Sequence, residues 1–136
     1  ASVGGATADE AALGYALGCY SFDKYKGRNA KKASEGSSGA ADKLASVVWP
    51  EGADKASVKA AAEATFLVRD LISTPAEDMG PASLQTATEA LGKIHGAKVS
   101  TIEGDALLKN NYPQIHAVGR AADPKHAPRL IELKWG

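Results

Sequence analysis

Histidine and carboxylate side chains are the groups in this chain that could bind a metal or move a proton, and they are widely spaced. The three histidines, His95, His116 and His126, occur in no H-E-x-x-H frame or similar ligand spacing, so we expect each at the surface or at a helix end. Glu77 and Asp78 could form a general acid/base pair, but neighbouring side chains in a bend usually point apart. Helix capping explains these two carboxylates better.

The signals for a nucleophile or a phosphate-binding loop are no stronger than those for a metal site or an acid/base pair. Cys19 lies inside an apolar helical pattern beside Leu17 and Tyr20, which predicts a buried structural thiol rather than an activated one. The serine-rich "EGSSGA" lacks the G-x-S-x-G frame, and neither G-x-G-x-x-G nor a P-loop occurs. Gly119 and Arg120 follow a predicted helix, whose C-terminal end repels anions. The sequence therefore predicts no catalytic residue and no metal ligand in this chain.

Length and charge limit the classes of function. The chain has 136 residues, 44% of them hydrophobic, which suits one compact globular unit. Sixteen basic residues balance sixteen acidic ones, so no global field favours nucleic acid, although Lys24, Lys26, Arg28, Lys31 and Lys32 form a local basic cluster. A solvated loop is the better interpretation of that cluster, because no recognition motif accompanies it.

Cysteine content and hydropathy point to a cytoplasmic location. A single cysteine permits no internal disulfide, which fits a reducing compartment. No window approaches the ~20 apolar residues of a membrane span, and the start lacks a signal-peptide profile. The chain does not begin with Met and closes on the strand-like "PRLIELKWG", which indicates a piece of a longer protein; a mature chain whose leader was removed is the alternative.

The first half of the chain is predicted to be mainly helical. Apolar spacing predicts a helix over 11–25, in which Gly14 and Gly18 suggest close packing on one face. An exposed loop over 26–43 and a short strand over 44–49 follow. The strongest helix is expected over 56–72, capped by Ser57 or Asp54, and it must end near residue 73 because Pro75 disfavours the helical conformation before it.

The second half combines helices with strands. Pro81 suits the first turn of a helix that ends at Gly96, with Met79 packed back over Leu84 as a hydrophobic staple. We expect a strand over 97–104, then a helix that begins with Asp105 as its cap and is kinked at Pro113. A closing strand is expected over 129–135, and the two late strands should pair or flank a shared neighbour. The predicted fold class is α/β: a helix-rich fragment with a few strands, an incomplete piece of a larger α/β sheet with crossover helices.

Three stretches in this order and spacing, "RDLISTPAEDMGPASLQTATEALG", "VSTIEGDALLKNNYPQIHAVGRAA" and "PRLIELKWG", resemble the leucyl (cytosol) aminopeptidase family of two-metal exopeptidases. The family pattern R-D-L-x-N-T-P-A-N-x-M-x-P departs here at Ser73 and Glu77, where the family usually has Asn. The matching residues, which the resemblance implies to be a structural hinge, are Arg69, Asp70, Leu71, Thr74, Pro75, Ala76, Met79 and Pro81.

The resemblance also implies a domain organisation and a chemistry. Residues 1–50 would be the C-terminal part of an N-terminal domain, residues 51–73 a linker and connecting helix, and residues 74–136 the start of the catalytic domain. The family removes N-terminal residues from peptides with two divalent metal ions, Zn or Mn, and forms hexamers. Its metal ligands and catalytic residues lie downstream of the motifs matched here, so this piece is expected to bind no metal and to be inactive alone.

Two other hypotheses stay open at this point. The chain could be a self-contained, non-catalytic interaction module, or it could have a DNA-binding accessory role, since some members of the resembled family bind DNA. The fragment hypothesis predicts self-association, because the last strand would expose an apolar face that includes Leu130, Leu133 and Trp135.

Overall fold

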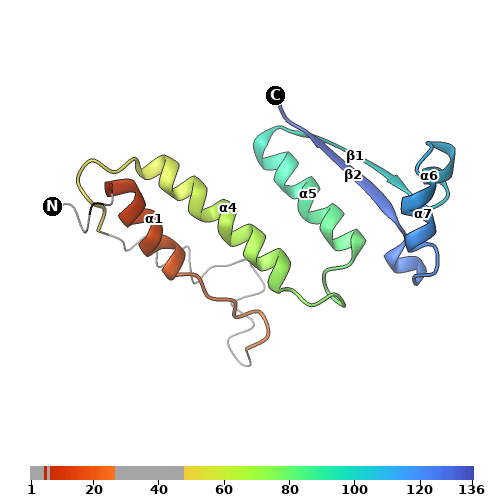
Figure 1. Ribbon diagram of the computed structural model, residues 1–136, viewed down its shortest axis with the longest axis horizontal. Helices are drawn as coiled ribbons and strands as arrows, with labels where there is room; N and C mark the ends of the chain where they lie inside the picture. The colour runs from red at the N-terminus through yellow and green to blue at the C-terminus, as the bar shows by residue number, and fades with distance from the viewer. Residues whose placement is uncertain (1–4, 6, 27–47) are drawn as a thin grey trace. The chain divides into compact units, whose positions relative to one another are not determined.

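The computed structural model describes residue 5, residues 7–26 and residues 48–136. The chain divides into two compact units, Ala1–Ser73 and Thr74–Gly136, which we call unit 1 and unit 2 (Figure 1). Most of the loop predicted over 26–43 lies outside the described residues, as do Lys31 and Lys32. In the described part of the chain, no helix combines the length and the apolar character that crossing a membrane requires.

Helix α1 (Ala8–Gly18) begins with a reciprocal cap. The amide of Glu10 donates to Thr7 Oγ1 at 3.2 Å, and the amide of Thr7 donates to Glu10 Oε2 at 2.7 Å. The helix predicted over 11–25 therefore starts and ends earlier than expected. It stops at Gly18, where the amide of Cys19 donates back to the carbonyl oxygens of Tyr15 and Ala16.

Helix α4 (Lys55–Ser73) confirms the long helix and one of its two proposed caps. Asp54 Oδ1 accepts from the amides of Ala56 and Ser57 at 3.1 and 3.2 Å. The prediction for the strand over 44–49 is wrong at its described end, because Val48 and Trp49 belong to no strand. A turn follows at once, and the remaining four residues lie outside the described part.

Helices α1 and α4 pack side by side and form the core of unit 1 (Figure 1). Ala12 and Ala16 of α1 are buried, as are Val58, Ala62 and Phe66, which recur every fourth residue of α4. The close packing predicted at the two glycines of α1 was wrong: Gly14 and Gly18 are exposed and have open space around them. The small residues that allow the approach are the alanines.

Helix α5 (Pro81–His95) opens unit 2 and has the two ends that the sequence predicted. Pro81 occupies the first helical position, where a missing amide hydrogen costs nothing. Gly96 ends the helix with a φ of +67°, a left-handed conformation that glycine adopts without strain. The amide of Ala97 then donates to the carbonyl oxygen of Gly92 at 2.8 Å.

Strands β1 (Lys98–Glu103) and β2 (Arg129–Lys134) form an antiparallel two-stranded sheet. The two late strands thus pair with each other directly, rather than through a parallel crossover. Val99 lies opposite Leu133, and these side chains share the face covered by α5, since a methyl group on Gly92 would lie 2.6 Å from Val99 Cγ2. A helix-rich α/β piece with a few strands is confirmed.

Short helices connect the two strands. The predicted kinked helix is two helices, α6 (Ala106–Lys109) and α7 (Pro113–Gly119), because Asn111 between them has a φ of +64°. A 3-10 turn, η2 (Pro124–His126), precedes β2. Leu107 of α6 is fully buried and is the largest such side chain among the described residues. The Asp105 side chain makes no capping hydrogen bond, and its Oδ1 instead lies 3.1 Å from His116 Nε2.

Candidate functional site

The first two residues of the sequence signature, Arg69 and Asp70, attach the end of α4 to the end of α1. Arg69 Nη1 donates to the carbonyl oxygen of Leu17 at 3.1 Å, and its guanidinium carbon lies 5.3 Å from the centre of the Tyr20 ring. The Tyr20 hydroxyl donates to Asp70 Oδ1 at 2.8 Å. A cation here also suits the orphan carbonyl groups at the C-terminal end of α1.

Tyr20 links this polar contact to the apolar core of unit 1. Its ring stacks on Phe66, with 5.5 Å between ring centroids. Burial of the ring, and then the hydrogen bond to Asp70, raise the pKa of Tyr20 above its ordinary value. The phenol therefore stays protonated and keeps donating to the carboxylate. This arrangement supports the packing of α1 against α4.

The second half of the signature is a tight bend that packs within unit 2. The carbonyl oxygen of Pro75 accepts from the amides of Asp78 and Met79, both at 2.9 Å. Glu77 pairs with Lys125 of η2 at 3.3 Å, and its side chain is 80% exposed. The carboxylates at positions 77 and 78 thus lie in a surface bend, as the sequence indicated, but the N-cap position of α5 is Gly80 and not either carboxylate.

Gly80 leaves room for His126 where the bend meets η2. A Cβ at position 80 would overlap the imidazole ring of His126, so a larger residue there would have to displace that ring. The φ of Gly80, −83°, is ordinary for any residue, so glycine is favoured here by space alone. The histidine at position 126 thus packs against the start of α5 and is only half-buried.

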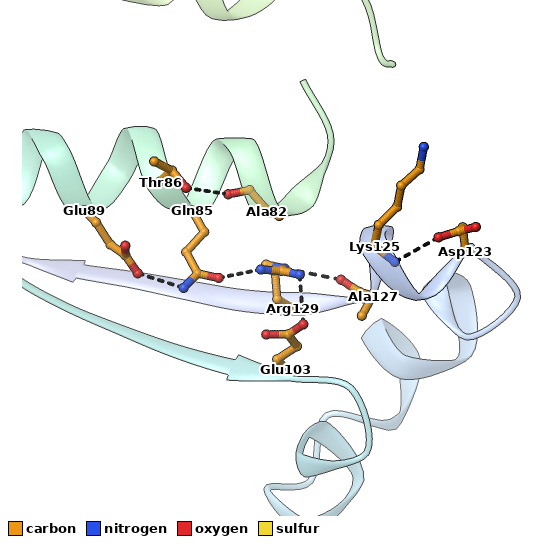
Figure 2. Close-up of polar contacts among 9 residues, drawn as sticks. All are labelled: Ala82, Gln85, Thr86, Glu89, Glu103, Asp123, Lys125, Ala127 and Arg129. Carbon is orange, nitrogen blue, oxygen red and sulfur yellow. Dashed lines mark hydrogen bonds and ion pairs between the residues drawn. The ribbon is translucent and has the colours of Figure 1, made fainter. Parts of the chain in front are cut away.

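A polar network centred on Arg129 joins α5, β1 and β2 (Figure 2). The Arg129 side chain is 7% exposed, and it donates to Gln85 Oε1 at 2.6 Å, Glu103 Oε1 at 2.9 Å and the carbonyl oxygen of Ala127 at 3.3 Å. Gln85 in turn donates to Glu89 at 2.7 Å. A buried guanidinium is tolerated only when its donors are satisfied in this way, so the network is structural.

An open apolar groove of about 680 Å³ lies beside this network on unit 2. We call it the α7 groove. Gly119 lines it and packs tightly on Pro128, since a Cβ there would overlap the proline ring. Arg120, the other residue considered for an anion contact, is exposed and follows the last residue of α7. Its apolar lining includes Pro81, Ile115, Val118, Ala122 and Pro128.

The other candidate residues remain separate from one another. Cys19 is half-buried at the end of α1, not inside the helix, so the expectation of a buried thiol was wrong. His95 is exposed at the end of α5, whereas His116 is half-buried and contacts Asp105. Among the residues that the structure describes, no three histidine, cysteine or carboxylate side chains lie together as a metal site would require.

The sequence did not predict the polar contact that joins the elements of unit 1, nor the one that joins the elements of unit 2. The bond from Tyr20 to Asp70 joins residues 50 positions apart, and Arg129 reaches Gln85 across 44 positions. The sequence did contain a tyrosine near the end of one helix and an Arg-Asp pair near the end of another. It does not show that these two helices pack together, so the contact between those residues could not be predicted.

Comparisons with known proteins show which family the chain resembles. The model of the cytosol aminopeptidase family catalytic domain matches residues 66–136, more than half of the chain. A probable cytosol aminopeptidase from Streptomyces avermitilis is 41% identical in an alignment of 133 positions that covers 90% of this chain and 24% of that protein. One from Streptomyces coelicolor is 33% identical in an alignment of 144 positions, gaps included, that covers 96% of this chain and 28% of that protein. The chain thus spans about a quarter of the length of these relatives.

Solved structures agree. The crystal structure of cytosol aminopeptidase from Coxiella burnetii matches with a TM-score of 0.71 and 34% identity, covering 94% of this chain and 24% of that one. The bottromycin maturation enzyme BotP in complex with Mn matches with a TM-score of 0.76 and 29% identity, covering 95% of this chain and 25% of that one. With more than half of its residues matched by the catalytic-domain model, the chain belongs to the cytosol aminopeptidase family.

Proposed function

We propose that this chain is part of a metal-dependent aminopeptidase that removes N-terminal amino acids from peptides, and that it forms the entry into the catalytic domain. The observation that carries the proposal is the catalytic-domain match over residues 66–136, which contains all of unit 2 and the end of α4. Residues 1–50 would close the N-terminal domain, residues 51–73 would connect, and residues 74–136 would begin the catalytic domain.

In this proposal two divalent ions, Zn or Mn, would supply the chemistry by making a water molecule a stronger nucleophile. Support comes from the relative solved in complex with Mn. The described residues offer no cluster of three ligands, so we assign neither ion to them. The ligands and the catalytic residues belong to the part of the longer protein that this chain does not span, and the piece alone is inactive.

The role left to this chain is to hold the entry in place. Arg69 and Asp70 secure α1, whereas Pro75 and Pro81 shape the bend, which Glu77 secures to η2. We propose that the whole signature is a structural hinge rather than a substrate site. We also propose a cytoplasmic homo-oligomer, a hexamer as in the resembled family, acting on peptide substrates.

An assay on the longer protein tests this function. Hydrolysis of leucine p-nitroanilide should appear with the longer protein, disappear after treatment with a chelator and return with Mn²⁺ or Zn²⁺. The 136-residue chain, prepared and treated identically, should show none of this activity. Chelator-resistant hydrolysis by the longer protein would contradict the metal assignment, and metal-dependent hydrolysis by the short chain would contradict the assignment of the catalytic residues elsewhere.

A further inference from the structure

We draw no further inference here: the strongest candidate, the open α7 groove of unit 2, is a small unpartnered apolar surface, and nothing among the described residues shows what covers it.

Discussion

Tyr20 donates a hydrogen bond of 2.8 Å to Asp70, and through it the end of α1 is attached to the family signature at the end of α4. The same ring stacks on Phe66 and lies under the Arg69 guanidinium. One side chain therefore joins the apolar core of unit 1 to its polar edge. Through these contacts Arg69 and Asp70 support the packing of α1 against α4.

Tyr20→Phe should weaken the attachment of α1 without disturbing the core. The ring and its stacking remain, but the hydrogen bond to a carboxylate is lost, which costs about 1–2 kcal/mol. Native-state hydrogen exchange of the α1 amides should accelerate accordingly. Tyr15→Phe is the matched control, since Tyr15 is 60% exposed on the same helix, and exchange should stay as in the parent. Equal exchange in both variants would contradict the supporting role of Tyr20.

The pKa of Tyr20 adds a prediction about high pH. Burial and the bond to Asp70 raise this pKa above 10.0, so the folded state holds the phenolic proton more tightly than the unfolded chain. The resulting stabilisation is present below pH ~10 and is lost as the pH rises through the folded-state pKa. The parent should therefore show a rise in tyrosinate absorbance that Tyr20→Phe lacks, and this rise should occur above pH ~10. A difference signal that titrates at or below that pH would refute this.

Arg129→Met should destabilise unit 2, because it removes the donors that α5, β1 and β2 share. Loss of hydrogen bonds to Gln85 and Glu103 from a side chain that is 7% exposed should cost about 2–3 kcal/mol. Hydrogen exchange of the β1 and β2 amides gives the measurement. Lys134→Met on the same strand is the control, because Lys134 is 70% exposed and its pairing with Glu132 contributes little. Similar exchange in the two variants would show that the network adds no stability.

Local sequence signals predicted the features that depend on adjacent residues. Pro81 and Gly96 fixed both ends of α5, and Asp54 capped α4, because each acts on its own turn of helix. The two late strands were predicted nearly to their ends, because β-branched and apolar residues cluster there. The family was identified from the same kind of short motif.

Features that depend on tertiary contacts were predicted less well. The apolar residues after Gly18 suggested that the helix continues to residue 25, but α1 ends at Gly18. Tyr20 lies beyond the helix, and its ring packs against Phe66. Glycines suggested close approach where alanines provide it. The Arg129 network could not be predicted, since its partners come from three elements whose arrangement the sequence does not reveal.

Gly80→Ala should displace His126 and loosen the contact between the signature bend and η2. The φ of −83° suits alanine, so the cost arises from the overlap of the new methyl group with the imidazole, about 1–3 kcal/mol. Exchange of the η2 and α5 amides should increase. In the double variant Gly80→Ala/His126→Ala the overlap is removed, and most of this increase should disappear.

Gly14→Ala replaces glycine by alanine as Gly80→Ala does, but it should stabilise the protein. Comparing the two variants separates the cost of steric overlap from the general effect of replacing glycine. Position 14 lies inside α1 with open space around it, and alanine should stabilise the helix there by about 0.5–1 kcal/mol. Amide exchange in α1 should therefore slow down. If Gly80→Ala stabilised unit 2 in the same way, the packing of His126 on Gly80 would contribute nothing to the stability of unit 2.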